Sequence, residues 1–497
     1  MFRFRYSWIL LGSWLLLQGA TAQGQTLVEK VREHTFANGL QLLLVERHDS
    51  PTVAAYITIG VGSVNETNET RGVAHLLEHM LFKGTKTLGT TDYAREAPLL
   101  ADIERVGAEL DALKSRAAAD PQRLAAVAAE LRQLQKQHQQ YVVKDEVSRI
   151  YAEKGGVGYN AFTSKDLTTY LVSLPSNKLE LWAAIESDRM KNAVLREFFT
   201  EREVIQEERR RSYESNPAGL LYENLLATAF AVHPYRAPII GWSSDIENLS
   251  LAETRDFLHQ YYAPVNTVMA LVGDVEFAQA VALIERYFGD IQPGMPVPPV
   301  LAVEPRQRGE KRVRIDFEAE PSLSIAFHKP TLPSRADYVF DLIDMVLGQG
   351  RTSRLYQSIV VEKQLAVSIS TSGAPGGRYP NLFVISATPR YPHTVAEVEQ
   401  AIYVELEKLA SEPVTEEELV RSRNRLATDR LRSLRGNSGL ARMLTYYQSV
   451  AGDWRYLVDY DAQVAAITAE EIMTVAKTYF QADNRTVAVL QKQGGTL

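Results

Sequence analysis

The sequence predicts an α+β fold made of two homologous domains, with a helical hairpin inserted in the first. Strand-like and helix-like segments are mixed without strict alternation, which favours α+β over a parallel α/β sheet. A chain of 497 residues is too long for one ordinary hydrophobic core. Two parts of the chain also resemble each other at a separation of about 220 residues, which indicates a duplicated domain.

The internal repeat is clearest in two segments that start with tyrosine. Residues 261–272, YYAPVNTVMALV, resemble residues 479–490, YFQADNRTVAVL. The aligned pairs are Tyr261 with Tyr479 and Asn266 with Asn484. A predicted helix precedes each segment and starts with a capping box, formed by Ser250 with Glu253 and by Thr468 with Glu471. A cap, a helix and a strand in the same order favour duplication over the alternative, two unrelated α+β domains.

The first domain is expected to span residues 23–288 and the second residues 312–497, the latter without a metal site. Residues 289–311 are rich in proline and lack periodicity, so they predict an extended linker. Strands are expected in the first domain at residues 40–45, 53–59, 167–173 and 268–272. Helices are expected there at residues 72–82, 178–192, 200–214 and 251–261.

The N-terminus has the pattern of a secretory signal peptide over residues 1–22. Arg3 and Arg5 form a basic start, an apolar stretch covers residues 8–17, and Ala20 and Ala22 form a small-residue cleavage site. We therefore expect a periplasmic protein. The alternative is an uncleaved anchor, although the apolar run is short for a membrane span and no other segment is apolar enough to cross a bilayer.

An unusual helical segment spans about residues 93–149. Two runs of apolar residues follow helical spacing, namely Ile103, Val106, Leu110, Leu113 and Leu124, Val127, Leu131, Leu134. Asp120-Pro121 separates the two runs, so we expect two antiparallel helices that form a hairpin. Its glutamines and charges favour a solvated projection or a partner surface over a part of the core.

Composition limits the partners and the ligands. The net charge is −7 without a long basic run, which argues against nucleic acid as a partner. The chain has no cysteine, so a zinc site would have to use histidine and carboxylate ligands.

The pentapeptide HLLEH, residues 75–79, predicts a catalytic metal site. On a helix, His75 and His79 share a face and could bind one zinc ion, while Glu78 faces the same side. Two histidine ligands beside a carboxylate base are the elements of a hydrolytic zinc site, and H-x-x-E-H is an inverted zinc-peptidase motif. The alternative is a hydrogen-bonded pair of histidines on a core helix.

A third ligand is needed, and its best source is the segment 200–214, TEREVIQEERRRSYE. Glu201 and Glu208 lie two helical turns apart and share a face, so spacing alone does not choose between them. Glu207 points away from Glu208 and is expected to pair with an arginine. The alternative is a solvated charged helix.

Three ordered motifs, GVAHLLEHMLFKGT, GGVGYNAFTSKDLTTY and EREVIQEE, resemble the catalytic half of the pitrilysin/insulinase family of zinc peptidases. The resemblance covers essentially the whole chain after the signal peptide, is strongest to bacterial two-domain members, and extends to the processing-peptidase branch. It implies one zinc per chain, held by His75, His79 and Glu208, with Glu78 as general base. It selects Glu208 because the family's ligand closes the matching stretch. Glu201 matches a family carboxylate that lies beside the metal site, where orienting a ligand histidine is a physically reasonable role.

The resemblance also implies an extended or unfolded peptide as substrate. Asn160 and Ala161 match family residues that contact the substrate backbone, whereas Asn160 alone could instead cap a turn. The strand at residues 167–173 alternates in character, and an exposed sheet edge can accept a peptide as an added strand.

The chain departs from the family in two respects. The hairpin enlarges the gap between the first two motifs and could gate access. Many members also carry an arginine and a tyrosine that assist at the oxyanion, and Val360 and Val367 occupy those positions here. We therefore expect the zinc-bearing subunit of a pair, completed by a second family subunit in a heterodimer, or a homodimer. A non-catalytic binding or assembly subunit is the alternative.

Overall fold

The computed structural model describes residues 27–116 and 118–492, which form two compact units. One unit comprises Arg32–Arg210 and Pro238–Val300, and the other mainly Arg211–Ala237 and the chain from Leu301 onward. The predicted signal peptide at 1–22 lies outside the described residues. Within them, every helix is too short or too polar to cross a membrane.

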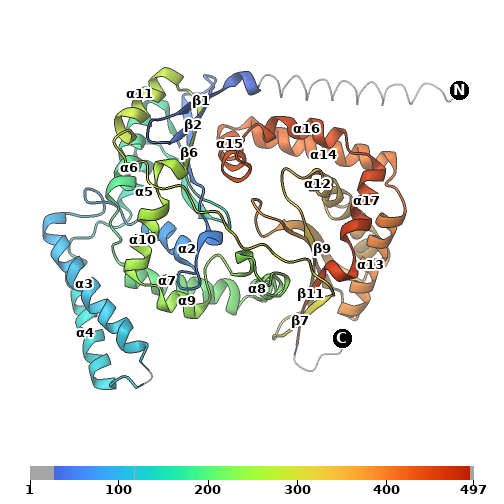
Figure 1. Ribbon diagram of the computed structural model, residues 1–497, viewed down its shortest axis with the longest axis horizontal. Helices are drawn as coiled ribbons and strands as arrows, with labels where there is room; N and C mark the ends of the chain where they lie inside the picture. The colour runs from blue at the N-terminus through green and yellow to red at the C-terminus, as the bar shows by residue number, and fades with distance from the viewer. Residues whose placement is uncertain (1–26, 117, 493–497) are drawn as a thin grey trace. The chain divides into compact units, whose positions relative to one another are not determined.

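The first unit is built on a six-stranded sheet in the order β1-β2-β6-β3-β5-β4 (Figure 1). Its strands are β1 (Val31–Thr35), β2 (Gln41–Glu46), β3 (Thr52–Ile59), β4 (Val157–Thr163), β5 (Thr168–Pro175) and β6 (Thr267–Gly273). Its α-helices are α2 (Val73–Met80), α3 (Tyr93–Lys114), α4 (Pro121–His138), α5 (Glu146–Glu153), α6 (Leu179–Asn192), α7 (Phe198–Arg209), α9 (Ser243–Asn248), α10 (Leu251–Tyr261) and α11 (Phe277–Phe288).

The second unit contains a five-stranded sheet in the order β7-β11-β8-β10-β9. Its strands are β7 (Lys311–Asp316), β8 (Ser322–Lys329), β9 (Ala366–Ala374), β10 (Asn381–Pro389) and β11 (Arg485–Gln491). Its α-helices are α8 (Pro217–Ala229), α12 (Arg335–Leu347), α13 (Val395–Ser411), α14 (Glu416–Arg435), α15 (Asn437–Ala451), α16 (Tyr456–Ala465) and α17 (Ala469–Tyr479). Its core lies between the sheet and α12, α13 and α17.

The two sheets share one topology. The order β2-β6-β3-β5-β4 corresponds to β7-β11-β8-β10-β9, and in each sheet the first pair is parallel and the following pairs are antiparallel. Both predicted capping boxes are present, at the starts of α10 and α17. The prediction of two homologous α+β domains is confirmed.

The domain spans expected from the sequence, 23–288 and 312–497, remain a prediction. The two compact units are each made of separate stretches of the chain, so one boundary in the sequence does not separate them. Helix α8 lies far before residue 289 but packs on β7, β8 and β11 of the second unit. It buries Leu221, Leu225, Leu226 and Ala229.

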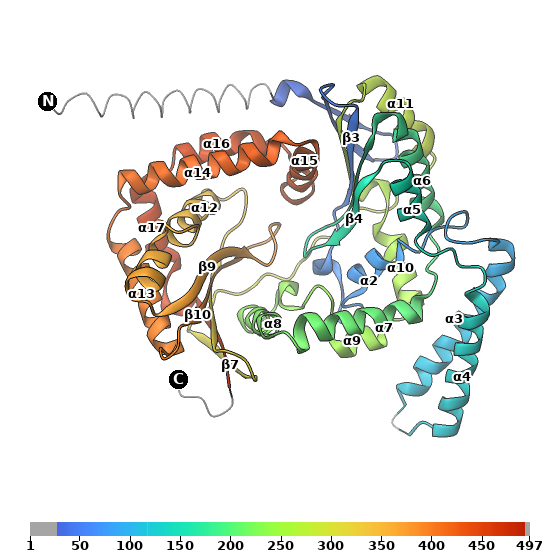
Figure 2. The ribbon, with the colours of Figure 1, turned by 180° about the vertical axis from the view of Figure 1, so that it is seen from behind.

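The predicted helical hairpin is present as α3 and α4, which lie side by side with their far ends extending away from the rest of the first unit (Figure 2). The expectation of a solvated projection is wrong for one side of α3, which packs against α7 over its second half, toward the tip of the hairpin. Asp111 of α3 accepts hydrogen bonds of 2.7 and 2.9 Å from Arg202 of α7. A Cβ at Gly107 would lie 1.9 Å from the ring of Phe199, so α3 packs closely on α7.

The exposed sheet edge is one strand earlier than the sequence suggested. Strand β5 lies between β3 and β4, and its Thr168, Tyr170 and Val172 are all buried. The edge is β4, whose glycine and polar residues hide the alternation typical of a strand. Asn160 lies within β4, beside an irregularity in its pairing with β5, and does not cap a turn.

The repeated asparagines make the same contact in both units. Asn266 Nδ2 donates to the carbonyl of Tyr261 at 3.0 Å, and Asn484 Nδ2 donates to that of Tyr479 at 2.9 Å. Asn484 also donates to the carbonyl of His328 at 2.9 Å, so it joins the end of α17 to β8.

Replacing Asn484 with alanine should lower the free energy of unfolding by about 1–2 kcal/mol, because two partly buried carbonyls lose their donor. Chemical denaturation measures this change. The exposed neighbour Gln481 provides the control, and an equal loss in Gln481→Ala would contradict the role given to Asn484.

Candidate metal centre

Helix α2 presents its polar residues on one face because the other face is buried. Its buried residues are Val73, Ala74, Leu76, Leu77 and Met80. The other positions of the helix include His75, Glu78 and His79, which therefore lie together on its opposite side. The side chains of His75 and His79 are 14% and 27% exposed, so both imidazoles are accessible from a partly enclosed space.

The start of α2 is held by a glycine and a carboxylate. Gly72 has a φ of +88°, and a Cβ there would lie 2.6 Å from the carbonyl oxygen of Ile240, so only glycine fits. Glu66 accepts hydrogen bonds of 2.9 Å from the backbone N–H groups of Gly72 and Ala74. A carboxylate at a helix N-terminus satisfies donors that the helix itself leaves free.

Three potential ligand atoms converge beside α2. Glu208, from α7, places its carboxylate oxygens 3.6 Å from Nε2 of His75 and 3.5 Å from Nε2 of His79. The ligand atoms of these three residues all lie within 4.8 Å of one another. Ligands of a tetrahedral zinc at bond lengths of about 2.1 Å are separated by about 3.4 Å, so this spacing fits a zinc ion.

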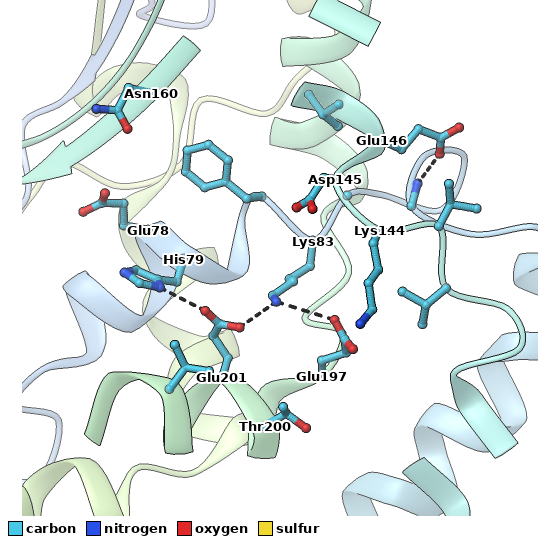
Figure 3. A pocket seen from close by; sticks show the side chains of 17 residues that line it. Glu78, His79, Lys83, Lys144, Asp145, Glu146, Asn160, Glu197, Thr200 and Glu201 are labelled. Carbon is cyan, nitrogen blue, oxygen red and sulfur yellow. Dashed lines mark hydrogen bonds and ion pairs between the residues drawn. The ribbon is translucent and has the colours of Figure 1, made fainter. Parts of the chain in front are cut away.

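Glu201 has a different position from Glu208, although both project from α7. Its Oε1 lies 2.9 Å from Nδ1 of His79 (Figure 3), whereas Glu208 lies near Nε2, the other ring nitrogen. This contact favours the tautomer with a proton on Nδ1 and leaves the Nε2 lone pair free for a metal. Lys83 Nζ lies 2.6 Å from the other oxygen of Glu201.

The electrostatics of the cluster suit a cation. Burial would raise the pKa of Glu201, but the hydrogen bonds from His79 and Lys83 outweigh it and lower the pKa to about 2. Burial, followed by the nearby His79, lowers the pKa of His75 to about 3. His75 is therefore a neutral imidazole at neutral pH, which is the form that binds a metal.

Glu78 lies beside the three candidate ligand residues but is not one of them. Its Oε2 accepts a hydrogen bond of 2.6 Å from the hydroxyl of Thr163, at the end of β4. Burial raises the pKa of Glu78, partly offset by this hydrogen bond. Thr163 was missed by the sequence analysis, and the only available signal was its place in the motif GYNAFTS.

A cavity of about 550 Å³ opens beside Glu78 and His79. Asn160 of β4 lines it, and Figure 3 shows this residue above Glu78. Ala161, by contrast, is only 7% exposed. The opposite wall comes from residues 142–147, which follow the inserted hairpin.

A second group of potential ligands, Glu46, His48 and Glu276, differs in exposure. Nε2 of His48 lies 3.9 Å from the carboxylate of Glu46 and 3.8 Å from that of Glu276. The side chain of His48 is 50% exposed, that of Glu46 31% and that of Glu276 59%. This arrangement is an ordinary surface ion-pair cluster. The cluster on α2 and α7 is more enclosed and has an orienting carboxylate.

The two positions at which the sequence departs from the family lie in the second unit. Val360 is 8% exposed, and Val367 on the edge strand β9 is 58% exposed. Glu207, as expected, pairs with an arginine, because Arg210 donates two hydrogen bonds of 2.7 Å to it.

Two family models match the chain. The model described as insulinase, peptidase family M16, matches residues 41–119 and 140–242, which include the three candidate ligands His75, His79 and Glu208 and also Glu78. The model described as the peptidase M16 inactive domain matches residues 248–426. Residues 120–139, which contain α4, fall between the two segments of the first match.

Two similar bacterial proteins match along nearly their whole length. The zinc protease PqqE of Helicobacter pylori is 26% identical over 485 residues, covering 96% of each chain. The uncharacterized zinc protease YmxG of Bacillus subtilis is 21% identical over 455 residues, covering 91% of this chain and 96% of that protein.

Solved structures give the same result for the fold. The crystal structure of a protease from Helicobacter pylori matches with a TM-score of 0.78 and 25% identity, over 93% of this chain and 99% of that one. A peptidase M16 inactive domain from Pseudomonas fluorescens matches with a TM-score of 0.74 and 18% identity, over 94% and 99%. Together with the two family models, which cover more than half of the sequence, these matches show that the chain belongs to the insulinase family, peptidase family M16.

Proposed function

We propose that the chain is an exported zinc metalloendopeptidase that hydrolyses extended or unfolded peptides. His75, His79 and Glu208 would hold one zinc ion, and Glu78 would act as the general base. The observation that carries this proposal is the spacing of 3.5 and 3.6 Å between the Glu208 carboxylate and the two Nε2 atoms. Zinc at this position would polarise the scissile carbonyl and lower the pKa of the attacking water.

The protein's own groups would move the proton. Glu78 accepts the proton of the attacking water and later delivers it to the leaving amine. Thr163 fixes the carboxylate through its 2.6 Å hydrogen bond, so the oxygen that is not bonded to Thr163 can face the substrate. Glu201 keeps the ring of His79 in the orientation that a metal ligand needs.

The substrate would bind along β4. This strand ends the sheet, so its outer backbone groups can pair with an extended peptide. Asn160 lies on it and lines the cavity beside Glu78, which supports its proposed role in substrate binding; Ala161, which pairs with Tyr170, would contribute through its backbone.

Export rests on the N-terminal pattern of a basic start, an apolar stretch and small residues. The periplasm is the proposed location. A structural relative, the first half of the periplasmic protease PqqL of Escherichia coli, matches with a TM-score of 0.67 at 18% identity, which concerns the fold alone.

Glu78→Gln should abolish peptide cleavage while zinc binding persists. General base catalysis contributes about 10²–10⁴-fold, so cleavage of a quenched peptide library should fall by at least about 100-fold. Zinc content is measured on the same samples, with Glu203→Gln on the exposed side of α7 as control. If the wild type and Glu78→Gln both bind zinc and neither cleaves peptides, the lack of a second subunit would explain the inactivity. If the wild type binds no zinc, the proposed function is contradicted.

Glu201→Ala should weaken zinc binding by about 10–100-fold, because His79 loses the carboxylate that orients its ring. Competition with a chromophoric chelator measures the affinity. Glu203→Ala changes the same residue type on the same helix at an exposed position and should leave the affinity unchanged. Equal affinities for the two variants would mean that Glu201 is not the orienting group.

The pair of valines supports a second subunit. Neither Val360 nor Val367 can donate a hydrogen bond to an oxyanion, and loss of one such donor costs about 10²–10³-fold in rate. The other candidate, a non-catalytic assembly subunit, is favoured by these two positions and by the similarity to proteins described as the peptidase M16 inactive domain.

The purified chain alone should therefore cleave peptides at least about 100-fold more slowly than when mixed with a family subunit that carries the arginine and tyrosine. Steady-state cleavage with and without that subunit measures the difference. Full activity of the chain alone, unchanged by the second subunit, would exclude the pairing.

A further inference from the structure

The base of the inserted hairpin encloses three charged or polar side chains that the proposed mechanism does not use. Glu96 of α3, His138 at the end of α4 and Arg196 before α7 are 0%, 2% and 0% exposed. His138 Nε2 lies 2.7 Å from Oε1 of Glu96. Arg196 donates to both oxygens of Glu96, at 2.6 and 3.0 Å. Burial would raise the pKa of Glu96, but these bonds outweigh it and lower the pKa to about 2.

Arg196 binds the loop that follows α2 with its other donors. Its Nη1 donates to the carbonyls of Lys83 and Leu88, at 3.1 and 3.2 Å, and its Nη2 donates to that of Thr85. All five N–H donors of the guanidinium are therefore used. Removing this cation would take a donor from three carbonyls and the charged partner from the Glu96 carboxylate, which would keep only its neutral contacts such as that with His138.

The loop held by Arg196 is also in contact with the metal cluster. Lys83 offers its carbonyl to Arg196 and its ammonium to Glu201, at 2.6 Å. Glu201 in turn holds Nδ1 of His79. Glu197, the residue after Arg196, starts α7 and lies 3.5 Å from the same ammonium. One guanidinium thus joins the end of α2 to the start of α7.

The contact between His138 and Glu96 is supplied by the inserted helix α4. It is the last residue of α4, and the match to the insulinase model leaves out residues 120–139. The chain after it returns directly to the cavity, because Val143 N–H donates to the carbonyl of Gly89 at 3.1 Å and both residues line the cavity.

We propose that the inserted hairpin is a positioning element for the metal centre, with Arg196 as the positioning residue and with Glu96 and His138 fixing its guanidinium. The inference rests on the proposed function for its catalytic meaning. The hairpin holds the loop 83–89 in place, and this loop sets the distance between the histidines of α2 and the carboxylates of α7. A hairpin that only projects toward a partner would not need a buried contact at its base.

His138→Phe tests the inference, because it removes the donor to Glu96 and keeps an aromatic ring of similar size. His138→Gln is the rescue variant, since its amide can still donate. Arg123→Ala is the matched control, because Arg123 pairs with Glu109 in the outer part of the same hairpin. Zinc affinity is measured by chelator competition, and hydrogen exchange is followed for the backbone amides of residues 83–89.

We expect about tenfold weaker zinc binding and about tenfold faster exchange of the loop in His138→Phe, with recovery in His138→Gln and no change in Arg123→Ala. Values for His138→Phe within twofold of those for Arg123→Ala would overturn the inference. Should His138→Phe fail to fold, Glu96→Gln tests the same contact with the same two measurements. If the wild type binds no zinc, the proposed function fails, and the exchange of the loop still decides whether the hairpin holds it.

Discussion

The hydrogen bond between His79 and Glu201 is the contact on which the metal centre depends. Glu201 and Glu208 lie two turns apart on α7, so one helix supplies both the group that orients His79 and the carboxylate that faces its other nitrogen. A ligand carboxylate that moved by an ångström would no longer match the spacing of a zinc site. The architecture must therefore fix α7 against α2 in both distance and rotation.

Helix α2 is held by polar contacts at three points along its length. Glu66 binds its first turn, Thr163 binds the carboxylate of Glu78 near its end, and Arg196 binds the loop after it. Apolar packing against the buried face of α2 supplies attraction but allows small sliding movements, whereas hydrogen bonds have a definite direction and length. The polar contacts therefore give the helix one position in the unit.

The turn after β4 joins two of these three contacts. Ser63 N–H donates to the carbonyl of Ser164 at 3.2 Å, and Val64 N–H donates to that of Lys165 at 2.9 Å. The segment that carries Glu66 is thus attached to the segment that carries Thr163. A displacement of β4, the proposed substrate-binding edge, would be transmitted to both the start of α2 and the proposed base.

Local patterns were enough to predict the helix with its two histidines and both capping boxes, because each depends on residues a few positions apart. The duplication could be predicted because such local patterns recur in the same order about 220 residues later. The contacts of Arg196, Glu96 and His138 could not be predicted, since these residues are distant in sequence and share no period. The edge strand was assigned to 167–173 because β4 follows two glycines, contains a third and shows no alternation. Its strand conformation comes from pairing with β5, which is a tertiary effect.

The second unit shows that the fold itself does not require the polar contacts around α2. In the first unit α2 lies in the connection from β3 to β4, and the same connection in the second unit, from β8 to β9, contains α12. Helix α12 carries no histidine and buries seven apolar or aromatic residues against its sheet. The topology therefore forms without the histidines of α2, although α12 has polar contacts of its own, through Asp341 and Asp344. Buried carboxylates and guanidinium groups cost free energy to desolvate, so their concentration around α2 and α7 indicates selection for the geometry of the site over stability alone.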